Sequence, residues 1–115
     1  DKCDFINTIV SGSASGELLL SGVSTVAYNY KFQNSLIKAS EQKNEHFVNT
    51  VWNAEPLFVN INNNKDYSYN FELQAGSPAI GKADRSYSLL LPYDLKGRSR
   101  LMDTDPDIGC YERGE

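Results

Sequence analysis

The sequence predicts an all-β protein: the terminal units of a parallel β-solenoid, followed by a C-terminal capping segment. Three observations predict this fold. The segment FINTI at residues 5–9 matches FQNSL at residues 32–36, and the offset is 27 residues at every matching position. Apolar and polar residues alternate along residues 28–36, which is the pattern of a half-buried strand. The chain holds seven tyrosines, and aromatic side chains fit the pleated surface of a sheet.

The repeated asparagine is the most informative feature of the matching segments. Asn34 falls on the apolar parity of residues 28–36, and Asn7 shares a parity with Phe5 and Ile9. A buried amide is costly unless it is hydrogen-bonded, and equivalent positions of stacked strands lie about 4.8 Å apart. We therefore expect Asn7 and Asn34 to be buried and bonded as a ladder within stacked units. Two copies fall short of the three usual in a repeat array, so a small β-sandwich with a chance similarity is the alternative.

The other elements follow from local patterns. Short strands are expected at residues 17–20, 56–61, 67–74 and 108–112, separated by turns rich in Ser, Gly, Pro and Asn. Phe47, Val48, Val51 and Trp52 have helix-like spacing and predict a short helix that ends before Pro56. Most tyrosines fall on strand parities that point inward, so the core is their expected place.

We expect one domain over residues 1–115. Residues 1–55 would form the terminal units of the solenoid, and residues 56–115 would form a capping segment over its open end, because solenoids need polar-faced end pieces. The chain opens with Asp1 rather than Met, which is what an internal fragment of a larger precursor would show.

The second half of the chain resembles a known family in its order of motifs. The residues that carry the likeness are Pro56, Phe58, Tyr69, Leu73, Ser77, Pro78, Ala79, Ile80, Asp94, Gly97, Arg100, Asp107, Ile108, Gly109, Tyr111 and Glu112. They resemble the choice-of-anchor Q domain, which follows right-handed parallel β-helix repeats in secreted or anchored bacterial proteins. The usual SPAID motif here ends in Gly81, which removes a carboxylate. The resemblance implies a bacterial surface protein, such as a lipoprotein anchored outside this chain.

Five residues of the second half are candidate structural residues of the turns: Asp94, Gly97, Arg100, Asp107 and Gly109. Asp-x-x-Gly is a turn signature, and carboxylates accept backbone or arginine hydrogen bonds in turns. We expect Arg100 to pair with one of the two aspartates, because a guanidinium binds a carboxylate with two parallel bonds.

Several kinds of catalytic and metal site are disfavoured. His46 is the only histidine, so we interpret it as a structural or surface residue. Asp103, Asp105 and Asp107 begin like a calcium loop, but Pro106 and the position of Gly109 break the EF-hand pattern; a looser Ca²⁺ site stays open. Cys3 and Cys110 could form a disulfide or remain two thiols. No metal site or cofactor is expected.

These observations favour a non-catalytic end domain of a secreted or surface-anchored bacterial β-helix protein that supports adhesion or glycan contact. The alternatives are a fragment of a polysaccharide lyase or glycoside hydrolase, and a carbohydrate-binding module. Trp52 and Tyr87 are the candidates for stacking on sugar rings. The expected partners are the preceding β-helix of the parent and a surface glycan. The net charge of −4, without a basic stripe, disfavours nucleic acid, and no apolar run approaches the ~20 residues that cross a membrane.

Overall fold

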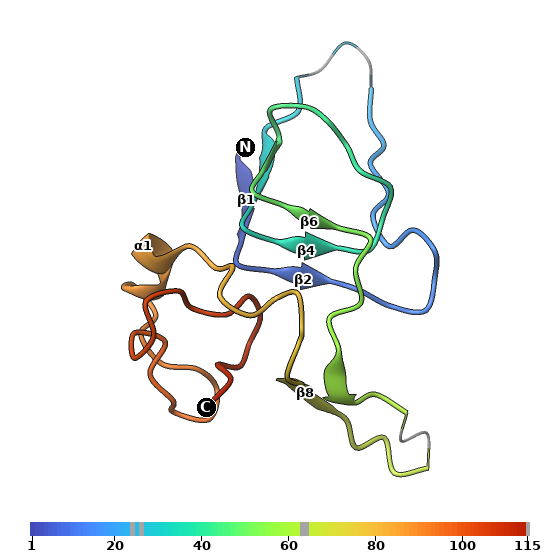
Figure 1. The fold of residues 1–115 in the computed structure, drawn as a ribbon. Coiled ribbons are helices and arrows are strands. Elements are labelled where there is room, and N and C mark those ends of the chain that lie inside the picture. Colours follow the sequence, from blue (N-terminus) through green and yellow to red (C-terminus); the bar gives the residue numbers. More distant parts are fainter. Residues whose placement is uncertain (24, 26, 63–64, 115) are drawn as a thin grey trace.

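The chain is all-β, with one short helix among the residues that the structure describes (Figure 1). The structure is a computed structural model and describes residues 1–23, 25, 27–62 and 65–114. The elements are β1 (Cys3–Ile6), β2 (Ile9–Val10), β3 (Tyr30–Gln33), β4 (Leu36–Ile37), β5 (Phe47–Val48), β6 (Val51–Trp52), β7 (Phe58–Asn60), β8 (Asn70–Leu73) and α1 (Arg85–Ser88).

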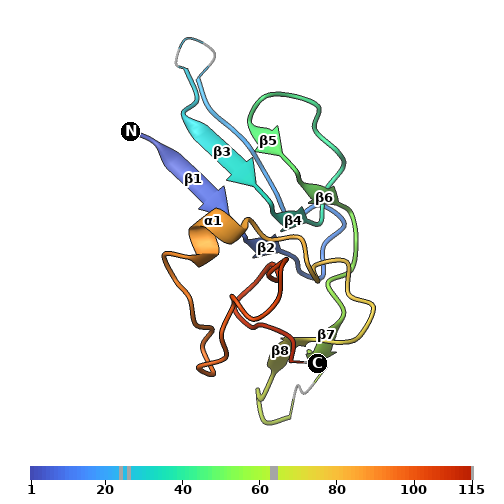
Figure 2. The ribbon, with the colours of Figure 1, turned by 60° about the vertical axis from the view of Figure 1, so that its left-hand side comes forward.

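The first six strands form two parallel sheets of three strands each. Their orders are β1-β3-β5 and β2-β4-β6, and β7 and β8 form a separate antiparallel pair. Phe5 is in register with Phe32, which is in register with Phe47. The chain therefore repeats a strand–turn–strand unit three times, at residues 3–10, 30–37 and 47–52 (Figures 1 and 2).

An asparagine with left-handed backbone joins the two strands of each unit. The φ angles of Asn7, Asn34 and Asn49 are 53°, 48° and 49°. Asparagine is among the few residues other than glycine that adopt this conformation readily. The asparagine therefore ends one strand and redirects the chain into the next sheet. The expected continuous strand through Asn34, with its side chain on the apolar parity, is wrong for this reason.

The helix expected near residue 50 is absent, and a third copy of the unit stands in its place. Phe47 and Val48 form β5, Asn49 is the turn, and Val51 and Trp52 form β6. Two short strands around a two-residue turn place apolar residues at i, i+1, i+4 and i+5, which is also a helical spacing. The third copy lies 15 residues after the second, since Phe32 pairs with Phe47, whereas the first offset is 27.

Two of the expected short strands are also absent: residues 17–20 and 108–112 have no strand structure. In the second segment the backbone donors bond to partners outside any ladder. The N–H of Ile108 donates to the carbonyl of Ala79 at 2.9 Å, and that of Glu112 donates to the Asp94 carboxylate at 2.9 Å. Ile108 is fully buried in the core, whereas Tyr111 is half-buried and Cys110 is exposed.

The sheet of β2, β4 and β6 is covered on both faces. On one face, Phe32 and Ile37 form a cluster with Phe47 and Trp52, and the rings of Phe5 and Phe32 stack with centroids 4.5 Å apart. The other face carries Ile9, Leu36 and Val51, one residue from each unit. These residues pack with Leu73, Phe58, Ala79, Ile80, Ala83 and Ile108 of the second half. Burial on both faces explains why the short strands of this sheet are apolar throughout.

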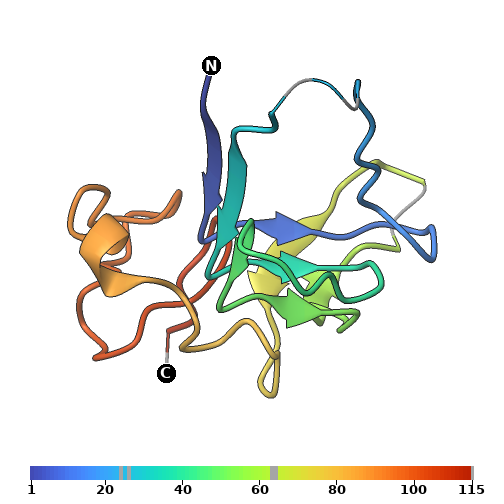
Figure 3. The same cartoon turned by 90° about the horizontal axis from the view of Figure 1, so that it is seen from above.

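The C-terminal half lies along the side of the three units. Its apolar residues contact Ile9, Leu36 and Val51, so all three units contribute to the interface. Figure 3 shows α1 and the following loops beside the strands. Leu36, in the middle unit, is fully buried there. The C-terminal half thus completes the hydrophobic core of the molecule.

Replacing Asn34 tests the role of the left-handed turn. Asn34→Ala should lower the free energy of unfolding by about 2–3 kcal/mol, because it adds left-handed strain and removes a hydrogen bond. Asn34→Gly loses only the bond, so its loss should be about 1 kcal/mol smaller. Urea unfolding measures both values. A glycine variant no more stable than the alanine variant would contradict the backbone explanation.

Candidate functional site

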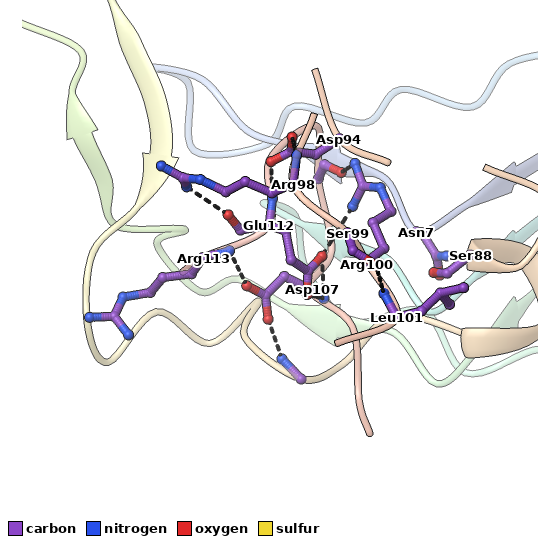
Figure 4. A network of polar contacts seen from close by, with 12 residues as sticks. Asn7, Ser88, Asp94, Arg98, Ser99, Arg100, Leu101, Asp107, Glu112 and Arg113 are labelled. Carbon is purple, nitrogen blue, oxygen red and sulfur yellow. Dashed lines mark hydrogen bonds and ion pairs between the residues drawn. The ribbon is translucent and has the colours of Figure 1, made fainter. Parts of the chain in front are cut away.

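The most organised polar region is a network around three buried carboxylates in the second half (Figure 4). Asp94, Asp107 and Glu112 are 8%, 3% and 4% exposed. Burying a charged carboxylate is expensive unless hydrogen bonds compensate it. Every buried side-chain nitrogen or oxygen in the described part of the chain has a hydrogen-bond partner. What the three carboxylates can do chemically therefore depends on which groups donate these hydrogen bonds.

Asp94 accepts three backbone hydrogen bonds. Its Oδ1 accepts from the N–H groups of Lys96 and Arg98, both at 2.8 Å, and its Oδ2 accepts from Glu112 at 2.9 Å. Gly97 sits in the turn with a φ of 77°, and its N–H donates to the Asp94 carbonyl at 3.0 Å. Burial acts to raise the pKa of Asp94, but the backbone donors outweigh it and the pKa lies below its ordinary value. Asp94 is therefore the organising residue of the 94–98 turn.

Asp107 joins two distant segments of the chain. Its Oδ1 accepts from the N–H of Gly81 and its Oδ2 from the N–H of Arg113, both at 2.8 Å. Gly81 has a φ of 63°, a left-handed conformation that glycine adopts without strain. The glycine in place of the usual aspartate of the resembled motif thus donates its N–H to Asp107.

Arg100 pairs with Glu112 and not with Asp94 or Asp107 as expected. Its Nη1 lies 3.4 Å from Glu112 Oε2, and its Nη2 donates to the carbonyl of Gly109 at 3.0 Å. Gly109, at a φ of 116°, donates its own N–H to the carbonyl of Asn7 at 3.1 Å. Arg100 therefore connects the chain terminus to the segment that contacts the first unit.

Glu112 is the residue of this network that sequence reasoning missed as a site residue. Burial raises its pKa to about 7, and the neighbouring Asp107 charge adds to the rise. The hydrogen bond from the Asp107 N–H and the charge of Arg100 act to lower the pKa. The Asp107 N–H donates to Glu112 Oε1 at 3.1 Å. A burial signal was present in the sequence, since Glu112 follows the apolar stretch at residues 108–111, but it does not identify the partner.

A further acidic residue, Glu72 of β8, ties the antiparallel strand pair to the 94–98 turn. Its carboxylate contacts Lys96 Nζ at 2.7 Å and Arg98 Nη1 at 3.0 Å. The hydrogen bond from Lys96 is the main cause that lowers the pKa of Glu72. The ion pairs fix the orientation of β8 relative to the network.

Asn7 and Asn34, the turn asparagines of the first two units, bond to the C-terminal half and not to each other as a ladder. Asn7 and Asn34 are half-buried rather than buried. Asn7 Oδ1 accepts from the N–H of Asp84 at 2.6 Å and its Nδ2 donates to the Asp84 carbonyl at 3.1 Å. Asn34 Nδ2 donates to the carbonyl of Lys82 at 3.0 Å. An asparagine from each of two units therefore holds the same stretch, residues 82–84.

Asp84 is another residue that the sequence patterns did not single out. Its carboxylate accepts from the N–H of Ser86 at 2.8 Å, capping α1, and from Gln33 Nε2 at 2.7 Å. The hydroxyl of Ser86 is the main cause that lowers the pKa of Asp84. Backbone and side chain of Asp84 together anchor α1 to the first two units.

The candidate glycan residues are not brought into one row. Trp52 is half-buried and packs against Phe47 with ring centroids 4.8 Å apart. Tyr87 lies on α1 and is 40% exposed. The expectation that most tyrosines are in the core is wrong: five of the seven are exposed, namely Tyr28, Tyr67, Tyr69, Tyr87 and Tyr93.

The remaining reactive side chains are dispersed. The ring of His46 stacks on Tyr30 at 4.2 Å, and its Nδ1 lies 2.8 Å from the Tyr30 carbonyl. Cys3 and Cys110 are free and exposed. Asp103 and Asp105 are exposed. Over residues 1–23, 25, 27–62 and 65–114, no three His, Cys, Asp or Glu side chains are grouped so as to hold a metal ion.

Comparisons with protein-family models, with curated proteins and with solved structures gave no match. The part of the chain that the structure describes holds no helix of the length and apolarity needed to cross a membrane.

The substitution Asp107→Asn tests the network. An amide in either orientation turns an NH₂ group toward the N–H of Gly81 or Arg113, so stability should fall by about 2–3 kcal/mol. The pKa of Glu112 should also fall, because the Asp107 charge contributes to its rise. Thermal or urea unfolding and NMR titration measure the two effects. Asp105→Asn, on an exposed side chain, is the matched control; equal losses in both variants would contradict the assignment.

The raised pKa of Glu112 predicts a pH dependence of stability. Between pH 4.5 and pH 7 the Glu112 carboxyl is protonated to a greater extent in the folded state than in the unfolded state. Its protonation therefore contributes fully to stability below pH 4.5, and this contribution is lost as the pH rises through 7. The change is about 3 kcal/mol at most. Asp94, whose pKa is lowered, acts in the opposite direction, so the comparison must be made between variants.

Glu112→Gln should therefore gain stability relative to the wild type as pH rises from 4.5 to 7.5. Urea unfolding across this range measures the difference, in which the other carboxylates cancel. Glu41→Gln, an exposed site, serves as control. A pH-independent difference between the wild type and Glu112→Gln would show that Glu112 titrates normally.

Proposed function

We propose that this chain is the non-catalytic end region of a longer parallel β-helix protein. Residues 1–55 supply its terminal units, and residues 56–115 close and brace them. The single observation that carries the proposal is the repeat of three strand–Asn–strand units in parallel register, with Phe5, Phe32 and Phe47 aligned. Consecutive parallel strands in two adjoining sheets are the arrangement from which a β-helix is extended.

The bracing role is supported by the contacts of the C-terminal half. It covers the apolar face formed by Ile9, Leu36 and Val51, and residues 82–84 receive the amides of Asn7 and Asn34. In a stack of parallel strands, the adjoining sheets are linked covalently only by the turns between their strands. A segment that crosses three units and bonds to two of their turns resists their separation.

The non-catalytic reading is supported by how the acids are used. A catalytic acid or base must reach a substrate proton within about 2.6–3.2 Å. The oxygens of Asp94 and Asp107 instead accept hydrogen bonds from the protein's own backbone. Glu112, whose pKa of about 7 would suit acid–base work, has both oxygens beside the N–H of Asp107. Its buried position serves the fold rather than a substrate.

The cellular setting of the proposal rests on the motif order in residues 56–112. Its likeness to the choice-of-anchor Q domain favours a right-handed β-helix protein at the bacterial cell surface or outside the cell, such as a lipoprotein. In this setting the partner of the chain is the preceding β-helix of the parent, which would make the contacts of adhesion, including contact with a surface glycan. Tyr87, exposed on α1, is the better placed of the two glycan candidates because Trp52 packs against Phe47.

An activity screen tests the non-catalytic proposal against the lyase and hydrolase alternatives. The chain should release no reducing or unsaturated sugar ends from acidic or neutral polysaccharides, with or without Ca²⁺. Released ends that disappear in a folded Glu112→Gln or Asp94→Asn variant, but persist in Glu41→Gln, would overturn it. A binding isotherm for one of the same glycans that is lost in Tyr87→Ala would favour the carbohydrate-binding alternative.

A further inference from the structure

Among the residues that the structure describes, no strand pairs with the first unit on its side away from the second unit. β1 stands at the edge of the order β1-β3-β5, and β2 stands at the edge of β2-β4-β6. Phe5 stacks on Phe32 through one face of its ring and is 37% exposed. The aromatic column of Phe5, Phe32 and Phe47 is therefore uncovered at the Phe5 end.

The hydrogen-bonding groups of this edge have a definite direction. The N–H groups of Cys3 and Asn7 donate to Asn29 and Gln33, while the carbonyls of Thr8 and Val10 accept from the second unit. In a parallel ladder the bonding groups of successive residues point alternately to the two sides. The backbone groups of Asp4, Ile6 and Ile9 consequently point away from β3 and β4, which makes this side a template for another parallel strand.

Two grooves border the same edge, and both are lined by Asn7 and Gly109, which are joined by the hydrogen bond from the Gly109 N–H to the Asn7 carbonyl. The first groove, of about 280 Å³, is lined by Ile6, Tyr87, Leu90 and Leu91 among others. The second, of about 430 Å³, is lined by Thr8, Ile9, Phe58, Phe71 and Cys110 among others. Leu90 and Leu91 are each 74% exposed and Phe71 is 45% exposed, so the C-terminal half presents apolar side chains at this edge.

We propose that this edge is the docking site for one further strand–Asn–strand unit of the pattern aromatic–apolar–Asn–x–aliphatic. The unit would come from the preceding part of the parent protein, so the inference rests on the function proposed above. Its strands pair in parallel with β1 and β2. Continuity with the existing interface between the first and second units is the basis for this choice of occupant.

The register of the existing units assigns each side chain of the added unit. Its aromatic residue extends the column of Phe5, as Phe5 extends that of Phe32. The residue after the aromatic follows Ile6 and lies toward the groove with Tyr87, Leu90 and Leu91. The aliphatic residue two positions after its asparagine follows Ile9 toward the groove with Phe58 and Phe71. The C-terminal half therefore reaches past the first unit and supplies the side wall for the next one.

The test joins a second copy of residues 1–27 to the N-terminus of the full chain, since 27 residues separate the first two units. The amides of Asp4, Ile6 and Ile9 in the original first unit are then followed by hydrogen exchange, because they donate outward only if the added unit pairs with them. They should exchange at least about tenfold more slowly than in the unmodified chain. A control fusion carries Phe5→Ser and Ile9→Ser in the added copy alone and should show no such protection.

The walls of the two grooves are tested within the same fusion. Leu90→Ser with Leu91→Ser in the original chain should remove most of the added protection. Leu95→Ser, at a residue that is 76% exposed and lines neither groove, should leave it unchanged. These leucines are exposed, so the variants should retain the fold, which the exchange of the buried Leu36 amide reports.

Equal exchange in the intact and control fusions would overturn the docking proposal. So would protection of Asp4, Ile6 and Ile9 in the unmodified chain that increases with protein concentration, because the edge would then be occupied by a second copy. Neither outcome bears on the absence of polysaccharide cleavage, so the non-catalytic function is judged separately by the activity screen.

Discussion

The left-handed backbone of Asn7, Asn34 and Asn49 is the constraint on which the rest of the structure depends. It turns the chain from one parallel sheet to the next at the same point in each unit, and so keeps the aromatic and aliphatic columns aligned. Because the asparagine lies between two strands, its side chain also does not follow the alternation of side chains along a strand. In two units that side chain reaches residues 82–84 of the other half. One residue type thus sets both the repeat and the attachment of the segment that braces it.

The C-terminal half has little regular secondary structure, and its buried backbone needs partners of another kind. Carboxylates supply them. Asp94 gathers the N–H groups of a tight turn, and Asp107 bonds residues 81 and 113, which are far apart in the sequence. Glu112 pairs with Arg100 while accepting the Asp107 N–H. Charge-assisted bonds of this type are about twice as strong as neutral ones, which suits a segment that lacks a ladder.

Much of the fold class follows from the sequence, because alternation and the repeated FxN segment depend on local geometry. The all-β character and strands near β7 and β8 are confirmed. The third unit was not predicted, because the spacing of Phe47, Val48, Val51 and Trp52 fits both a helix and two short strands around a turn.

The candidate site was only partly predictable. Asp94 and Gly97 lie in a turn whose signature is local, whereas the partners of Asp107, the N–H groups of Gly81 and Arg113, do not follow from the residues around it. The partner of Arg100 depends on how residues 100 and 112 approach in space, which no sequence spacing determines. Tyr67 and Tyr69 are exposed since only the inner end of β8, at Leu73, reaches the core.

The bond between Asn7 and Asp84 joins residues 77 positions apart, whereas the three units pair over separations of 27 and 15. Closing long loops costs more entropy, and structures dominated by distant pairings fold slowly. During synthesis the units leave the ribosome well before the segment that covers Ile9, Leu36 and Val51. Their apolar face therefore stays uncovered until residues 77–112 emerge. During this interval the nascent chain is most prone to misassociation.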